Sequence, residues 1–218
     1  MKFSTFTTLL ILIFTSLSSL AMAQSCYEKA YSYSGANLSK NDALKLCMGA
    51  ANSLAPVECY QKAYSYSGLN MSAQDALSFC AGVYTTEPVK CYQKAYSYSG
   101  LNLKASDAVI LCKNTESAAG SIKCYGDAYS SSGLNLSASD ALILCSGTKY
   151  PGEVVSCYSK AYSYSGLNFS AADAKRLCTY TENANATISC YQRAYSYSGS
   201  NLSKEESLEL CMGRVRCQ

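Results

Sequence analysis

The sequence contains no histidine and no tryptophan, and only 15% of its 218 residues are charged. The absence of histidine excludes catalysis that uses an imidazole as base or proton shuttle, and it excludes metal sites built on histidine. The formal net charge is +3, and no block of Lys or Arg exists that could neutralise a phosphate backbone. We therefore expect no nucleic-acid partner, no metal and no other cofactor.

The N-terminal segment has the pattern of a secretory signal peptide. An apolar run over residues 9–14 follows a weakly positive start, and Ala21-Met22-Ala23 fits the small-residue rule for cleavage. A membrane anchor is the alternative, for which the unbroken apolar run is short. We expect cleavage near Ala23, so that residues 1–23 are the signal peptide. No later stretch is long and apolar enough for a transmembrane segment, which predicts a secreted, periplasmic or cell-surface protein.

The chain is rich in cysteine, with 13 residues at regular intervals. Pairs separated by 21 residues recur every 32–33 residues, which is the signature of a tandem repeat. Six repeats begin near residues 26, 59, 91, 124, 157 and 190. Residues 215–218 match the start of a truncated seventh repeat, because Val215 stands two places before a cysteine as an apolar residue does elsewhere.

The first half of each repeat is predicted to be an amphipathic helix. In the second repeat, Cys59, Ala63 and Tyr66 fall on one narrow stripe, and Lys62 lies on the polar side. Gly68 is expected to end this helix as a left-handed cap, and glycine holds the same place in all six repeats. The asparagine two residues later is interpreted as a turn residue.

The second half of each repeat has the signals of a second helix. In the second repeat Ser72 is the expected N-cap, and Asp75 three residues on would complete a capping box. Equivalent pairs occur in five repeats, while the third has Lys104 in place of the serine. A glycine such as Gly82 follows the helix in four repeats and is expected to terminate it.

Helical hairpins this small must stack to bury their apolar faces. The predicted fold is therefore all-α, an α-solenoid of six tandem disulfide-stapled helical hairpins that forms a single repeat domain over residues 24–218. Its helix–turn–helix layout is similar to that of tetratricopeptide and Sel1-like repeats, although the tetratricopeptide Trp and Leu-Gly signature is absent.

Two disulfide schemes fit the spacing. An antiparallel hairpin brings the start of its first helix beside the end of its second, and the cysteines occupy those positions. The preferred bridges thus lie within repeats: Cys26–Cys47, Cys59–Cys80, Cys91–Cys112, Cys124–Cys145, Cys157–Cys178 and Cys190–Cys211. The alternative joins each second cysteine to the first cysteine of the next repeat and ends in Cys211–Cys217.

The chain has 20 tyrosines, of which 17 occupy three positions after the first cysteine of a repeat, as in Tyr92, Tyr96 and Tyr98. These positions fall on or beside the Cys–Ala stripe. We therefore expect most of them to pack in the core rather than contact a ligand. Their alternative role is recognition, because Tyr-Ser-Gly surfaces resemble antibody paratopes in chemistry.

A basic residue recurs three places after the first cysteine and is expected to form a ladder on the polar side of the stacked helices. The ladder consists of Lys29, Lys62, Lys94, Lys160 and Arg193, and Asp127 interrupts it in the fourth repeat. Gln61 and Ser65 flank it in the second repeat. A solvated charged face is the simpler interpretation. The other is a site for an anionic or polyhydroxylated partner.

No constellation of residues suggests an enzyme, because the serines lack a histidine base and the carboxylates occupy capping positions. The sequence favours an exported scaffold that binds an extracytoplasmic protein or glycan. The alternative is a structural envelope or spacer protein without a discrete ligand.

Overall fold

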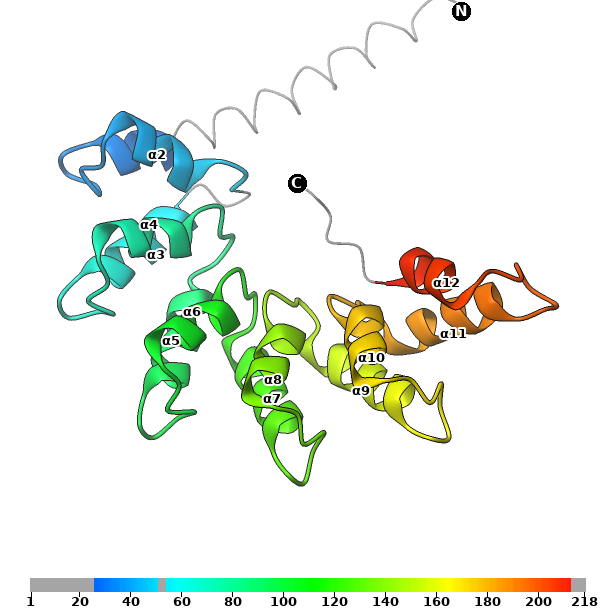
Figure 1. Cartoon of the computed structure of the whole chain (residues 1–218). Coiled ribbons are helices and arrows are strands. Elements are labelled where there is room, and N and C mark those ends of the chain that lie inside the picture. Colours follow the sequence, from blue (N-terminus) through cyan, green and yellow to red (C-terminus); the bar gives the residue numbers. More distant parts are fainter. Residues whose placement is uncertain (1–25, 51–53, 213–218) are drawn as a thin grey trace, which may run out of the picture. The chain divides into compact units, whose positions relative to one another are not determined.

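The computed structural model of the chain describes residues 26–50 and 54–212, in which helices are connected by turns and loops and no strand occurs. Residues 26–31 form the first helix of the first hairpin. The helices that follow are α2 (Lys40–Cys47), α3 (Ala55–Tyr64), α4 (Ala73–Cys80), α5 (Glu87–Tyr96), α6 (Ala105–Cys112), α7 (Ala118–Tyr129), α8 (Ala138–Cys145), α9 (Pro151–Tyr162), α10 (Ala171–Cys178), α11 (Ala184–Tyr195) and α12 (Lys204–Cys211) (Figure 1). The predicted all-α solenoid of tandem hairpins is confirmed.

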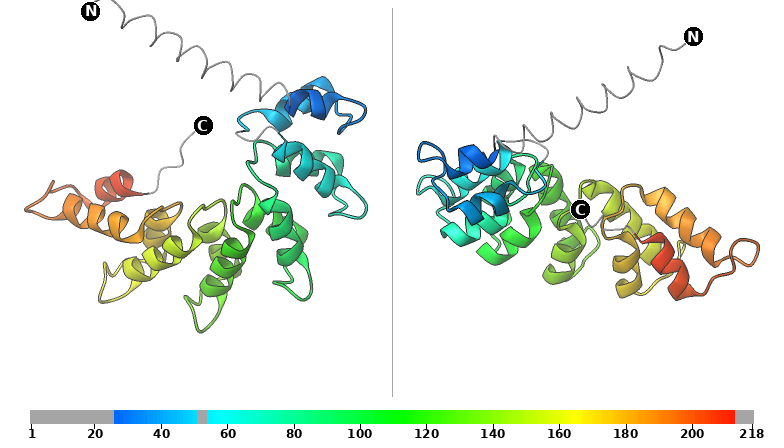
Figure 2. Two further views of the ribbon diagram at one scale, coloured as in Figure 1. Left: turned by 180° about the vertical axis from the view of Figure 1, so that it is seen from behind. Right: turned by 90° about the horizontal axis from the view of Figure 1, so that it is seen from above.

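The contacts divide the chain into two compact units, residues 1–89 and 90–218. In the first unit, α2 contacts both helices of the following hairpin, α3 and α4. In the second unit, α9 lies against α7 and α11, and α12 lies against α10, so successive hairpins lie side by side in each view of Figures 1 and 2. The single domain predicted for residues 24–218 stays a prediction.

Each described hairpin is closed by the disulfide that its own two cysteines form, as the preferred scheme predicts. The bonded Cα atoms lie 5.5–5.9 Å apart and the sequence separation is always 21. In the chain-entropy model, closing a loop of this length stabilises the fold by about 3 kcal/mol. Cys217 and the truncated seventh repeat lie outside the described residues.

The predicted serine caps are confirmed in five repeats. In the second repeat the Oγ of Ser72 accepts a hydrogen bond from the backbone N–H of Asp75 at 3.1 Å. A reciprocal capping box forms only at Ser203, whose backbone N–H donates to Glu206. The aspartates of the first, second and fifth repeats accept the hydroxyl proton of their serine, as Asp75 does, but their side chain is one methylene shorter than that of Glu206 and makes no reciprocal box. Lys104 caps its helix without a side-chain hydrogen bond.

The loop between the two helices differs from the prediction. The first helix of the second repeat ends at Tyr64, four residues before Gly68, and the left-handed residue of the loop is Asn70 with φ 51°. Gly68 is required for another reason, since a Cβ there would lie 1.8 Å from the carbonyl oxygen of Lys62. That close approach lets the next backbone N–H, from Leu69, donate to the same oxygen at 3.0 Å.

Glycine does supply the left-handed residue after the second helix. Gly49, Gly82 and Gly147 have φ between 61° and 79°, as predicted, and the fourth such glycine, Gly213, lies outside the described residues. The two repeats without this glycine place Asn114 and Tyr180 in the same conformation.

Candidate binding surface

Each hairpin has a disulfide end and a loop end; the first tyrosine of a repeat follows the first cysteine, and the second and third tyrosines belong to the loop end. The first tyrosine is buried in the second to sixth repeats and partly buried in the first; Tyr158, the most enclosed, is 1% exposed. The second is 52–54% exposed, and the third is 91% exposed. The expectation that most repeat tyrosines are core residues is therefore wrong for two of the three positions. The fully exposed set is Tyr33, Tyr66, Tyr98, Tyr164 and Tyr197, and Ser131 takes this place in the fourth repeat.

Local geometry explains these three degrees of exposure. The first and second tyrosines are four residues apart on one helix face, so Tyr158 and Tyr162 stack with ring centroids 5.6 Å apart. The second ring thus covers the first and leaves its own outer face open. The third tyrosine follows the end of the helix, so the helical periodicity no longer turns it toward the core. Its ring projects from the loop end.

The predicted basic ladder is exposed in every repeat that carries it. None of its members takes part in an ion pair within residues 26–50 and 54–212. Lys160 donates to the amide oxygen of Asn185 at 2.5 Å. Asp127, which replaces the basic residue in the fourth repeat, pairs with Lys123 at 2.5 Å. Lys29 and Lys62 belong to the first compact unit, and Lys94, Lys160 and Arg193 to the second.

The loop fixes the backbone of each ladder residue. The carbonyl oxygen of Lys62 accepts the N–H of Leu69 and lies directly against Gly68. The same arrangement recurs at Lys94, where Leu101 donates at 3.2 Å. The cation and the exposed tyrosine of a repeat are therefore parts of one hydrogen-bonded loop end and keep the same spacing along the chain in each repeat.

The polar neighbours predicted beside the ladder are engaged within the protein. Gln61 donates through Nε2 to the carbonyl oxygen of Gly35 in the preceding hairpin at 3.3 Å. Ser97 donates its hydroxyl proton to the carbonyl oxygen of Lys94 at 3.3 Å. Gln61 thus joins two neighbouring hairpins and Ser97 stabilises its own loop, and the exposed groups of the loop end are the cations and the phenols.

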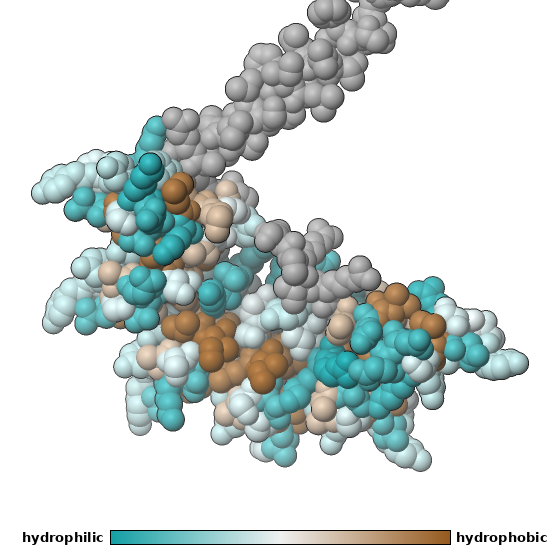
Figure 3. Space-filling view, turned by 45° about the horizontal axis from the view of Figure 1, so that its top comes forward, coloured by the Kyte–Doolittle hydropathy of each residue, from teal (hydrophilic) through white to brown (hydrophobic). Residues whose placement is uncertain are grey.

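Exposed aliphatic side chains are a feature that the sequence reasoning missed. Ile110 and Ile143 occupy the same position, two residues before the second cysteine, on α6 and α8, and they are 50% and 53% exposed. Figure 3 shows hydrophobic surface over these two helices. Leu44 and Leu210 are each 51% exposed, at other positions of their helices. The comparison of equivalent positions between repeats, rather than the periodicity within one repeat, carries this signal.

In the described part of the chain, no cluster of three or more His, Cys, Asp or Glu residues could hold a metal ion. The search for a bilayer-spanning helix among those same residues finds none of sufficient length and hydropathy. The six disulfides fit an oxidising, extracytoplasmic compartment.

The chain matches no family model, and comparison with curated proteins and with solved structures gives no match either.

Proposed function

We propose that this protein is an exported scaffold that binds an anionic macromolecule, an acidic glycan or an acidic protein segment, through the loop ends of its hairpins. The observation that carries the proposal is the third tyrosine, which is 91% exposed in each of the five repeats that have it. Large aromatic side chains are normally covered in a folded protein, and their repeated exposure indicates a surface that a partner covers. We further propose that cleavage near Ala23 releases the chain into the extracytoplasmic space.

The residue types at the loop ends fit such a partner. Tyrosine gives a large, rigid and amphipathic contact area, and it loses little conformational entropy when it binds. The ladder adds one cation in each of five repeats, and none of these cations is neutralised by a carboxylate within the described residues. A partner with repeated negative charges would meet several loop ends at once, and avidity would raise the affinity above that of one contact.

A structural envelope or spacer protein is the second candidate. The uniform hairpins and the disulfide in every repeat favour it, because a spacer needs a durable and regular shape but no binding residues. The two candidates differ in what the loop ends do. A spacer would tolerate the replacement of its exposed tyrosines and cations, whereas a binding scaffold would lose its partner.

Binding to defined polyanions tests the proposal. The probes are polygalacturonate and poly-glutamate, with dextran as a neutral control, and the measurement is titration calorimetry at low and at high salt. We expect the double variant Lys62→Glu, Lys94→Glu to bind at least tenfold more weakly, and added salt to weaken the wild type. Tyr66→Ser with Tyr98→Ser should also weaken binding, and serine is compatible with this position because Ser131 already occupies it.

The matched control is Lys113→Glu, an exposed cation at the end of α6 and away from the loop end. It should bind as the wild type does apart from the small effect of net charge. All variants should melt like the wild type, because the replaced side chains are exposed. Binding that ignores both sets of changes, or failure to bind any polyanion, would favour the spacer.

A further inference from the structure

Two leucines at opposite ends of the repeat array differ in exposure from their equivalents in other repeats. The residue three places before the second cysteine is buried at Leu77, Leu142 and Leu208 but 51% exposed at Leu44 in the first repeat. The residue one place before that cysteine is fully buried at Leu46, Leu111, Leu144 and Leu177 but 51% exposed at Leu210 in the last repeat. The same side chain is therefore covered inside the array and uncovered at one end of it.

The contacts between hairpins explain this pattern. Second helices of consecutive repeats touch in both compact units: α2 touches α4, α6 touches α8, and α10 touches α12. The earlier leucine is exposed in the first described hairpin, and the later leucine is exposed in the last described hairpin. We name the two uncovered surfaces the front face, which contains Leu44, and the rear face, which contains Leu210. Tyr27 also belongs to the front face, because it is only partly buried while the equivalent Tyr60 is 4% exposed.

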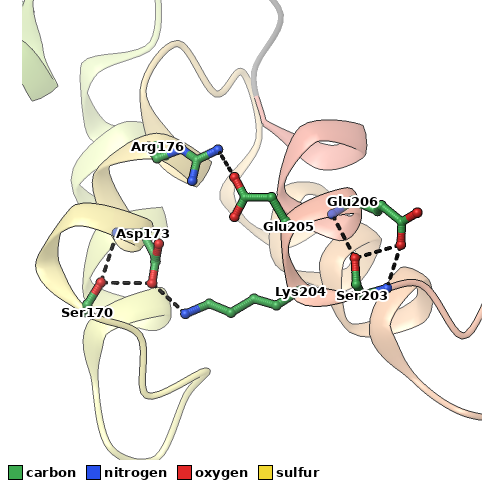
Figure 4. A network of polar contacts seen from close by, with 7 residues as sticks. All are labelled: Ser170, Asp173, Arg176, Ser203, Lys204, Glu205 and Glu206. Atoms are coloured by element: carbon green, nitrogen blue, oxygen red, sulfur yellow. Dashed lines mark hydrogen bonds and ion pairs between the residues drawn. The ribbon is translucent and has the colours of Figure 1, made fainter.

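An internal junction shows which polar contacts accompany this packing. Between the fifth and sixth repeats, Lys204 pairs with Asp173 at 2.5 Å and Arg176 pairs with Glu205 at 2.6 Å (Figure 4). Asp173 is the acidic residue that accepts from the N-cap Ser170, and the lysine that reaches it follows the N-cap of the next repeat. The ammonium of Lys204 and the hydroxyl of Ser170 hold the pKa of Asp173 below its usual value.

The front face carries a lysine and the rear face a carboxylate at the positions that form this ion pair inside the array. Only two repeats have a lysine directly after the N-cap position, Lys204 in the last and Lys40 in the first. Lys40 is exposed and has no carboxylate partner in the described part of the chain. On the rear face, Glu206 stands at the place that Asp173 occupies, bonded to its own N-cap Ser203, and no lysine reaches it among the described residues.

The buried tyrosines also interact with the preceding hairpin. Burial is the largest cause of the raised pKa of Tyr60. The neighbouring Tyr64 raises this pKa further, and so does the carboxylate of Asp42 in the preceding hairpin. Asp173 has the same influence on Tyr191. The first tyrosine of a hairpin therefore lies near the capping carboxylate of the hairpin before it. Within residues 26–50 and 54–212, no hairpin precedes that of Tyr27 and none follows that of Glu206.

We propose that the rear face of one copy of this chain binds the front face of a second copy, with Leu210 packed against Leu44 and Glu206 paired with Lys40. The junction would reproduce the packing found between consecutive hairpins within each compact unit. It is heterologous, since different surfaces meet, so it leads to rings or to open chains of copies. It does not depend on the proposed binding of a polyanion, which uses the loop ends.

Complementary variants test the proposal by sedimentation velocity on the oxidised protein over a wide range of concentrations. The wild type should form species larger than a dimer as the concentration rises. Leu44→Glu destroys the front face and Leu210→Glu the rear face, so each variant alone should be monomeric. An equimolar mixture should give a dimer and nothing larger, because one intact front face and one intact rear face remain.

The matched control is Ile143→Glu, which replaces a side chain of similar exposure on an internal hairpin and should assemble like the wild type. Lys40→Gln should weaken assembly and reduce its dependence on salt, whereas Lys113→Gln should do neither. A wild type that stays monomeric, or a mixture that stays monomeric, would overturn the proposal. So would persistent self-association of Leu44→Glu alone, since that result would show a contact between two rear faces.

Discussion

Gly126 lies inside α7, where glycine costs helix stability. A Cβ added at this position would meet no heavy atom within 4 Å beyond the local backbone. We therefore predict that Gly126→Ala stabilises the protein by about 0.5–1 kcal/mol. Chemical denaturation measures the gain, and amide exchange over residues 124–145 should become slower.

Gly133, in the same hairpin, supplies the control. A Cβ there would lie 1.9 Å from the carbonyl oxygen of Asp127, so Gly133→Ala must distort the loop and should lower the stability. If both substitutions had the same sign, the space around these two glycines would not be the cause. The fourth repeat is expected to be the weakest because of Gly126. Its Ser131 costs little, since the equivalent tyrosines are exposed.

Lys104 is the position where a missing cap can be restored. Its backbone has φ −63° and ψ 154°, almost the same as Ser137 with φ −61° and ψ 154°, but it makes no side-chain cap. Lys104→Ser should therefore raise the free energy of unfolding by about 1 kcal/mol, and Ser137→Ala should lower it by a similar amount. Thermal melts of the two variants check the pair. An unchanged melt for Lys104→Ser would mean that the third helix pair gains nothing from this hydrogen bond.

At the scale of the hairpin, the disulfide is the element most open to experiment. The double variant Cys157→Ala, Cys178→Ala should lose about 3 kcal/mol, because the loop closed by this bond is 21 residues long. Amide exchange should rise first in α9 and α10. Full reduction should remove helical structure cooperatively, as circular dichroism in reductant would show. Retention of the whole helical signal would indicate that packing between hairpins suffices.

The two helices of the hairpin could be predicted from sequence, and the loop between them only in part. The constant interval between cysteines, together with the geometry of an antiparallel pair, was enough to give Cys59–Cys80 and its equivalents. The loop was harder because glycine suggests a left-handed cap. Here Asn70 takes the positive φ, and Gly68 is needed for close contact with a carbonyl group, which depends on three-dimensional proximity.

The misplaced helix end also led to the wrong expectation for the exposure of the tyrosines. Continuing the helical period to Gly68 placed Tyr66 on the buried stripe, but the helix ends at Tyr64 and leaves Tyr66 outside it. The exposure of the basic ladder was predicted correctly, because its residues still lie inside the helix, where the helical period holds. Which face a partner covers depends on assembly and charge, and one chain does not contain that information.

At the scale of the whole molecule, the buried tyrosines should make the protein less stable at alkaline pH. Burial raises the pKa of Tyr60, Tyr125, Tyr158 and Tyr191 above the usual value of about 10. Their contribution is fully present below that usual value and is lost as the pH rises through the folded-state pKa. We predict that the urea midpoint, measured after any free thiol is alkylated, falls steeply above about pH 10.

Replacement of single rings checks the origin of this fall. The hydroxyl of Tyr158 is buried without a hydrogen-bond partner among the described residues. Tyr158→Phe should therefore be neutral or stabilising near neutral pH and should reduce the alkaline loss. Tyr164→Phe, at a fully exposed position, should leave the pH profile unchanged. If it shifted the profile as much as Tyr158→Phe does, burial would not be the cause.

The position of the disulfides has a mechanical consequence. Each one joins a cysteine inside the first helix of a hairpin to the last residue of the second helix, so a covalent path runs from cysteine to cysteine without entering the loop end. If the chain were pulled from outside the array, the load would pass through sulfur atoms and connectors. The 21-residue segment between bonded cysteines, about 70 Å when extended, would be bypassed. The tyrosines and cations of the loop ends would then keep their local arrangement while the connectors lengthened.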